Sequence, residues 1–262
     1  MRQNKAKRAL GEGGVAIGTM LFEFNTTGMA RILATTGVDF AMIDLEHTGW
    51  SLETVRMLTA TAVATDFAPL VRVPASDYHL IARTLDVGAM GVMVPMVETV
   101  EQARAIVQAT KYPPVGRRGS AFGIAHDDYQ SSDVPETMAS ANREGLVIAM
   151  IETRRGVENV EQIAAVEGID VLWLGHFDLT ASLGIAGQFD HPEYQRSVDR
   201  IVAAAQAEGK ASGFMFKSVE EGQAMLARGF RCLAYWGDLW IYQQALGQGV
   251  AAVRQAAQRG QS

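Results

Sequence analysis

Acidic side chains follow two short apolar runs of this 262-residue sequence, and they could hold a metal ion. Glu152 directly follows the run Leu146–Ile151, and Asp178 follows the run Val171–Leu174 after three residues. Carboxylate ligands without a thiol suit a hard cation such as Mg²⁺ or Mn²⁺, and two ligands leave positions for substrate and water. The competing interpretation is that each carboxylate only caps the helix that follows it. The pattern therefore indicates a candidate metal pair.

Three further side chains could transfer protons or stabilise charge. His47 ends the motif Asp44-Leu-Glu-His47, and an imidazole can take or give a proton at neutral pH, although a purely structural histidine is the alternative. Arg72 ends an apolar run and stays charged, so it needs a substrate anion or a structural ion pair with a neighbouring acid. Asp86 ends an expected helix (78–86), where it opposes the helix dipole; it is either solvated or held by a specific partner.

The elements that must position these residues are eight short, almost continuously apolar runs. Such runs are typical of strands that are buried on both faces, and segments of helical period separate them. This alternation predicts an α/β fold, a (β/α)₈ TIM barrel formed by residues 1–262 as one domain, in which the polar residues after each strand meet at one rim. An open doubly wound sheet is the alternative, but no Gly-x-Gly-x-x-Gly follows the first run. The eight runs are Val15–Met20, Phe40–Ile43, Ala68–Val73, Gly91–Val94, Leu146–Ile151, Val171–Leu174, Gly213–Phe216 and Cys232–Tyr235, and the clearest helical segments are Ser51–Ala64, Val100–Ala109, Pro192–Glu208 and Val219–Arg228.

Composition and the remaining segments narrow the class of protein. The net charge of −6 argues against a nucleic-acid partner, and no apolar run is long enough to span a membrane. Cys232 is the only cysteine, which excludes an intrachain disulfide, and we expect a cytoplasmic protein. Residues 1–12 carry four cations and are expected to be a flexible end. The long connection 111–145 is either a lid or a surface excursion with a short helix.

A set of motifs in a fixed order resembles one enzyme family. From about Ile17 to Gly247 the chain resembles the HpcH/HpaI class II pyruvate aldolases, which include 4-hydroxy-2-oxoheptanedioate and 2-dehydro-3-deoxyglucarate aldolases. Each motif is modest alone, but their order and spacing are specific. The motifs are Ile43-Asp-Leu-Glu-His47, Val71-Arg72, Leu85-Asp-Val-Gly88, Val94-Pro-Met-Val97, Lys111-Tyr-Pro-Pro114 with Arg118-Gly119, Ile151-Glu-Thr-Arg154 and Gly175-His-Phe-Asp-Leu179.

The resemblance implies a fold, an assembly and a role for each candidate residue. The fold is a barrel of the phosphoenolpyruvate/pyruvate type, assembled as a homohexamer with a C-terminal helix, here 237–258, exchanged between subunits. A divalent cation (Mg²⁺ or Mn²⁺, with Co²⁺ also suitable) binds the carboxylate pair. The implied roles are Glu152 and Asp178 as metal ligands, His47 as catalytic base, Arg72 as the group that stabilises an enolate, Asp86 as an acid that reaches a neighbouring subunit's histidine, and Met150, Gly175, His176, Phe177 and Asp178 as the substrate-binding region.

The implied reaction is reversible cleavage of a 4-hydroxy-2-oxo acid to pyruvate, or a relative such as hydroxypyruvate, and an aldehyde. A Schiff-base mechanism through Lys217, an acyl-CoA lyase of the citramalyl- or malyl-CoA type and a non-catalytic 2-oxo-acid-binding barrel are the alternatives. The chain departs from the family pattern at two places beside the metal pair. Met150 stands where many members carry glutamine, and Gly175-His-Phe-Asp178 replaces a Gly-Pro-x-Asp turn, so the aldehyde is the least predictable part of the substrate.

Overall fold

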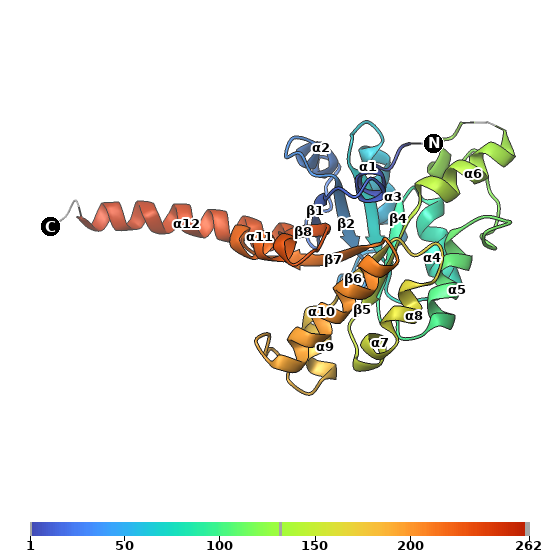
Figure 1. Ribbon diagram of the computed structural model, residues 1–262. Coiled ribbons are helices and arrows are strands. Elements are labelled where there is room, and N and C mark those ends of the chain that lie inside the picture. The colour runs from blue at the N-terminus through green and yellow to red at the C-terminus, as the bar shows by residue number, and fades with distance from the viewer. Residues whose placement is uncertain (1, 131–132, 260–262) are drawn as a thin grey trace.

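The protein is a closed barrel, described by a computed structural model for residues 2–130 and 133–259. Within those residues eight parallel strands pair in chain order and β1 pairs with β8, which confirms the predicted barrel (Figure 1). The strand bounds differ from the predicted runs by at most two residues. The strands are β1 (Ala16–Leu21), β2 (Phe40–Asp44), β3 (Ala68–Arg72), β4 (Gly91–Val94), β5 (Leu146–Ile151), β6 (Val171–Leu174), β7 (Ala211–Phe216) and β8 (Cys232–Gly237).

The continuous apolar character of the strands has a direct physical cause. Alternate side chains point into the barrel and outward against the helices, so both faces of each strand are buried. Met42, Leu70 and Ile148 belong to the inner cluster, whereas Ile43, Val71 and Val147 pack in the outer one. Two separate apolar cores therefore hold the strands, and their carboxyl ends meet at one end of the barrel, which we call the rim.

Several helices begin with a side chain that satisfies free amide groups of the first turn. Ser51 accepts a hydrogen bond from the Glu53 amide, Ser218 accepts one from the Glu221 amide, and Thr99 forms a capping box with Gln102. These helices follow strands directly, so their N-termini lie at the rim. Their bounds are α2 (Met29–Ala34), α3 (Leu52–Ala62), α4 (Tyr78–Asp86), α5 (Val100–Thr110), α7 (Arg154–Glu158), α8 (Val160–Ala164), α9 (His176–Ser182), α10 (Pro192–Ala207) and α11 (Val219–Ala227).

The N-terminal segment differs from the flexible end expected for residues 1–12. Met1 lies outside the described residues, but Lys5–Gly11 form helix α1, which packs at the barrel end opposite the rim. Asn4 is fully buried, and its side-chain amide donates hydrogen bonds to the carbonyl oxygens of Met90 and Glu144. The sequence did not predict this helix, because a short segment with four cations shows no clear apolar periodicity. Tertiary contacts such as those of Asn4 hold it in place.

The connection 111–145 joins α5 to β5 and therefore begins and ends at the barrel end opposite the rim. It contains a short 3₁₀ turn (Ala125–Asp127) and helix α6 (Val134–Glu144); residues 131–132 lie outside the described part. The Arg118 guanidinium contacts the Asp86 carboxylate at 2.6 Å, which ties the segment to α4. Connections from a helix to the next strand lie at the barrel end opposite the rim, and a role of 111–145 as a lid stays a prediction.

Helix α12 (Asp238–Arg259) follows β8 and projects away from the barrel (Figure 1). Its apolar residues Tyr242, Leu246, Val250 and Val253 are exposed. Within residues 2–130 and 133–259, no helix has both the length and the apolar composition needed to cross a bilayer.

Candidate active site

A cavity of about 480 Å³ opens at the rim and brings together most of the predicted site residues. Its wall combines residues that lie in, or shortly after, each of the eight strands. Because all strands are parallel, residues far apart in the chain meet here. The predicted residues that line the cavity are His47, Arg72, Met150, Gly175, His176, Phe177 and Asp178.

A buried guanidinium forms one side of the cavity. Arg72 is only 6% exposed, its Nε donates to Asp44 Oδ1 at 2.6 Å, and its Nη1 lies 3.2 Å from Glu46 Oε2. Asp44 is fully buried and also accepts the amide N–H groups of Glu46 and His47. The structural ion pair that the sequence left open is thus present, and the same guanidinium still lines the cavity.

Glu152 is held at the rim by its neighbours on both sides. It is 2% exposed, and its Oε1 accepts a hydrogen bond from the Met96 amide at 2.7 Å. A side chain at Gly175 would place a Cβ 2.4 Å from Glu152 Oε2, so only glycine allows this approach of β5 and β6. Thr153, and not Glu152, caps α7 through its hydroxyl. The capping interpretation of Glu152 is therefore wrong.

Carboxylates outnumber cations around this cavity. Burial, together with the nearby Glu46 and Asp178, raises the pKa of Glu152 to about 7 against the opposing effect of the Met96 hydrogen bond. Burial also raises the pKa of Glu46, whose buried Oε2 has no hydrogen-bond partner among the described residues although it faces Arg72. Carboxylates held this close favour either a proton or a divalent cation between them.

The donor set fits a divalent cation held by few protein ligands. Among the described residues, no group of three or more His, Cys, Asp and Glu side chains forms a complete ligand cluster. Glu152 and Asp178 supply two oxygen donors, and Asp178 lies exposed in the first turn of α9. Gly175 at the N-cap makes no side-chain hydrogen bond to that helix, and Asp178 is not its cap. Such a site leaves positions for a chelating substrate.

His47 reaches the cavity from the loop after β2. Its side chain is 59% exposed, and its Nε2 lies 3.8 Å from Glu46 Oε2. Because the backbone of His47 is anchored on Asp44, the imidazole is positioned while its ring remains open to a substrate. This arrangement is suitable for a general base.

Met150 and His176 both add apolar surface to the cavity. Met150 is 5% exposed and lines the cavity with its thioether side chain. The His176 ring lies 4.4 Å from the Phe177 ring and 5.0 Å from the Phe214 ring, measured between centroids. Burial among these rings lowers the pKa of His176 to about 4, against the opposing effect of Asp178. The imidazole is therefore neutral at physiological pH.

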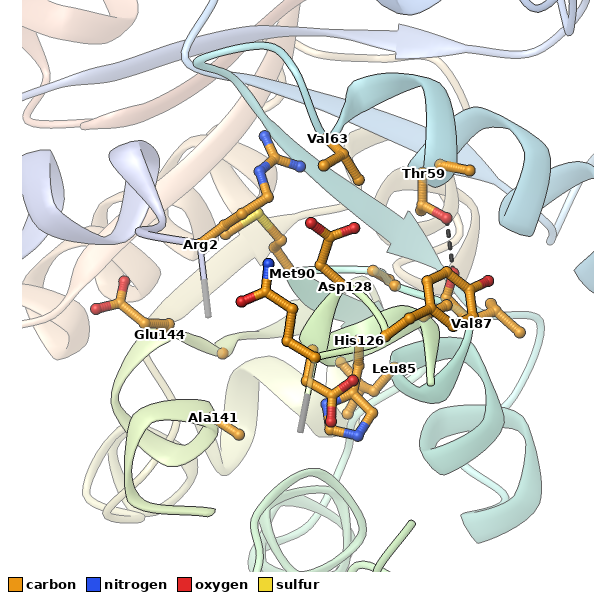
Figure 2. A pocket seen from close by; sticks show the side chains of 18 of the residues that line it. Arg2, Thr59, Val63, Leu85, Val87, Met90, His126, Asp128, Ala141 and Glu144 are labelled. Carbon is orange, nitrogen blue, oxygen red and sulfur yellow. Dashed lines mark hydrogen bonds between the residues drawn. The ribbon is translucent and has the colours of Figure 1, made fainter. Parts of the chain in front are cut away.

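Asp86 is the predicted site residue that the fold does not bring to the rim. It ends α4 at the opposite end of the barrel, where its Oδ1 pairs with Arg118. Arg118 also lines a second cavity, of about 440 Å³, between α3, α4 and α6. Figure 2 shows Arg2, Asp128 and Glu144 around this cavity, with the Thr59 hydroxyl donating to the Val87 carbonyl. Within one chain Asp86 thus has no access to His47.

Lys217 and Asp238, the polar residues after β7 and β8, do not line the rim cavity. The Lys217 side chain is exposed and does not line the rim cavity, so a Schiff base there has no support. Asp238 is 6% exposed and accepts the amide N–H groups of Phe22, Glu23, Phe24 and Leu239, which fixes the loop after β1. The sequence did not predict this role. It also did not predict Met93, Trp173 and Met215, which the inward positions of their strands could have indicated, or Trp240 in α12.

Comparisons with known proteins agree with this geometry. The sequence model of the family described as HpcH/HpaI aldolase/citrate lyase matches residues 19–240. A 2-keto-3-deoxy-L-rhamnonate aldolase of Klebsiella pneumoniae is 36% identical over 95% of this chain and 92% of its own length. A 5-keto-4-deoxy-D-glucarate aldolase of the same organism is 35% identical over 92% of this chain and 93% of its own. The crystal structure of an HpcH/HpaI aldolase from Desulfitobacterium hafniense superimposes with a TM-score of 0.90 at 31% identity, covering 95% of this chain and 96% of the other.

The raised pKa of Glu152 has a measurable consequence for stability. Its folded pKa of about 7 exceeds the ordinary value of 4.5, so the folded protein holds a proton that the unfolded chain has lost between these pH values. The metal-free protein should therefore lose stability as the pH rises from about 5 to 8, on the order of 3 kcal/mol for this group. When the melting temperature is measured in EDTA across this pH range, it should change less with pH for Glu152→Gln than for the parent.

Glu53→Gln is the matched control, because Glu53 is exposed on α3 and should keep the parent's dependence. The same pH dependence of the melting temperature in the parent and in Glu152→Gln would contradict the raised pKa assigned to Glu152.

Proposed function

Because the chain belongs to the HpcH/HpaI aldolase/citrate lyase family, we propose that it is a divalent-metal-dependent aldolase acting on a 4-hydroxy-2-oxo acid. The reaction breaks the bond between C3 and C4 and gives pyruvate, or a related acid such as hydroxypyruvate, and an aldehyde. The observation that carries the proposal is that buried Glu152 lies within electrostatic reach of Asp178 and Arg72, at the edge of a cavity lined by Asp178, Arg72 and His47. Relatives named as aldolases of 2-keto-3-deoxy and 5-keto-4-deoxy sugar acids support a substrate of this class.

The metal-binding role goes to Glu152 and Asp178. Their oxygen donors, with no thiol beside them, favour Mg²⁺ or Mn²⁺, and Co²⁺ is also suitable. When bound, the cation supplies Lewis acidity toward the keto and carboxylate oxygens of a 2-oxo acid. The surplus of carboxylates at the rim supports this assignment, because a dication would offset both the burial and the repulsion that raise the pKa of Glu152.

The chain's own groups then divide the work of cleavage. His47 takes the proton of the 4-hydroxyl, and the electron pair of the C3–C4 bond passes into the enolate of the 2-oxo acid as the aldehyde leaves. Arg72, fixed by Asp44, holds positive charge beside the oxygen where the enolate charge develops. The region around Gly175, Phe177 and Asp178 receives the substrate carboxylate. C3 finally takes a proton to give the free 2-oxo acid.

We assign Asp86 to the site of a neighbouring subunit. Since it lies at the opposite end of its own barrel, its proposed effect on the basicity of a histidine requires contact between subunits. The Arg118 contact orients the Asp86 carboxylate at the surface of α4.

A homohexamer in which α12 is exchanged between subunits would cover two exposed apolar surfaces at once. Tyr242, Leu246, Val250 and Val253 form a stripe along α12 at intervals of three or four residues. On the barrel, Ile17 of β1 is 43% exposed, whereas the outward residue Val71 of β3 is fully buried. Because α12 projects away from its own barrel, both its apolar stripe and the β1 surface at Ile17 are exposed. A partner's α12 packed beside β1 would bury both of these surfaces.

Chelation provides the direct test of the proposed reaction. Pyruvate release from 2-keto-3-deoxy-L-rhamnonate, followed through lactate dehydrogenase, should fall by roughly 10³-fold or more after exhaustive EDTA treatment, because the enolate charge loses its main stabilisation. Adding Mn²⁺ or Mg²⁺ should restore it in the parent but not in Glu152→Gln. Undiminished cleavage without metal would overturn the mechanism, and turnover of malyl-CoA alone would instead identify an acyl-CoA lyase.

The base is tested separately from the metal. His47→Asn should lower kcat by about 10²- to 10⁴-fold while Mn²⁺ affinity stays at the parent's value, because His47 is assigned to proton transfer and not to ligation. His191→Asn, at the start of α10, is the control and should keep the parent's kcat. A His47→Asn protein that cleaves as fast as the parent would remove the assigned base.

The assembly is tested on α12. Leu246→Glu with Val250→Glu places two charges on the apolar stripe, and sedimentation should then give a species smaller than that of the parent. Gln244→Glu with Gln248→Glu adds the same charge on the other side of the helix and should leave the assembly intact. Identical sedimentation of both double variants would refute an interface through this stripe.

A further inference from the structure

The groups proposed to bind and cleave the 2-oxo acid occupy one part of the rim cavity. His47 and Asp178 follow β2 and β6, and Arg72 ends β3; these three line the cavity, and Glu152 follows β5 beside it. These groups take up the carboxylate, the keto oxygen and the 4-hydroxyl of the substrate. The remaining part of the cavity must therefore hold whatever lies beyond C4, which is the tail of the aldehyde product.

That remaining part is bounded by β7, β8 and β1, and its wall is apolar. Met215 lines it from β7, Leu239 and Trp240 line it after β8, and Phe22 lines it after β1. The Phe22 and Trp240 rings pack with their centroids 4.9 Å apart, and the loop bearing Phe22 is fixed by Asp238. This wall is therefore preorganised. The cavity is also bounded by Met93, Met150 and Trp173, which are at most 5% exposed.

A charged or strongly polar tail finds little to bind on this wall. Among the described residues that line the cavity, Arg72 is the one lysine or arginine, and it is already paired with Asp44 and Glu46. Serine, threonine, asparagine and glutamine are absent from the same lining residues. Glu23, which follows Phe22, also lines the cavity, and its carboxylate would repel an anion. Burying an unpaired carboxylate there is costly.

We propose that the acceptor aldehyde has an uncharged, apolar tail, held against Phe22, Met215, Leu239 and Trp240. This inference rests on the proposed aldolase function, and it names the substrate class of the same cavity. Substrates that end in a second carboxylate are disfavoured. Leu239 and its neighbours thus determine specificity without taking part in the cleavage.

Two uncleavable acids of equal length test the proposal by binding alone. 2-Oxohexanoate ends in a methyl group and 2-oxoadipate in a carboxylate, and both lack the 4-hydroxyl that cleavage requires. Calorimetric titration of the full-length protein loaded with Mn²⁺ should give a dissociation constant roughly tenfold or more lower for 2-oxohexanoate, since small changes in an apolar pocket alter affinity by this order. Equal binding, or tighter binding of 2-oxoadipate, would overturn the proposal.

A positive charge introduced at Leu239 tests whether the tail of the bound acid lies against this wall. Leu239→Lys should narrow or invert the ratio of the two dissociation constants, because an ammonium group can then pair with the 2-oxoadipate tail. Val219→Lys adds the same charge at a residue that is 62% exposed and does not line the cavity, so it should keep the parent's ratio. A parent ratio retained in Leu239→Lys would exclude this wall as the site of the tail.

Failure of the proposed function has a different signature. In that case no 4-hydroxy-2-oxo acid releases pyruvate in the kinetic assay, whichever of the two acids binds. A protein that releases pyruvate yet prefers 2-oxoadipate would retain the aldolase function and lose only the apolar tail.

Discussion

The buried pair of Arg72 and Asp44 is the interaction on which the geometry of the rim depends. The two residues end β3 and β2, lie opposite one another in the strand register, and are nearly or fully buried. Removing one partner of such a pair leaves an uncompensated buried charge, at a cost of about 3–5 kcal/mol. Since Asp44 also accepts the amide N–H groups of Glu46 and His47, one carboxylate fixes both a cationic group and the loop that carries the histidine.

Around this pair the rim accumulates more negative charge than it neutralises. Glu152 is held by the amide of Met96, a non-glycine residue in the left-handed region with φ of 54°. Such a conformation costs energy and persists where the surrounding structure enforces it, often at functional sites. On its other side Gly175 lets β6 approach the same carboxylate. The strained backbone at Met96 after β4 and the absence of a side chain at Gly175 after β6 therefore both allow the Glu152 carboxylate to be buried. This arrangement is consistent with a cation bound to that carboxylate.

The sequence predicted the barrel well because buried parallel strands carry their signal locally. Runs such as Leu146–Ile151 are apolar throughout, and the caps Ser51 and Ser218 mark the helices that follow. Polar residues at or shortly after the ends of strands, such as Arg72 and His47, could be predicted because parallel strands bring those ends to one rim. Helix α1 was missed because Asn4 is bound to segments 86 and 140 residues away, which no local pattern reveals. The length of the connection 111–145 does not reveal where it lies, because its place at one end of the barrel follows only from the order of α5 and β5.

The part of the cavity that the sequence could not describe is the one where this chain departs from its relatives. Inward side chains such as Met93, Trp173 and Met215 come from three separate strands, and their common wall exists only once the barrel closes. Met150 and His176 act in the same direction, since one replaces an amide by a thioether and the other is an imidazole kept neutral by its aromatic neighbours. Neither residue is among the groups assigned to bind the metal, transfer a proton or stabilise an enolate. On the proposed assignment, Met150 and His176 therefore shape apolar surface of the cavity, and the groups assigned to bond cleavage are other residues of the rim.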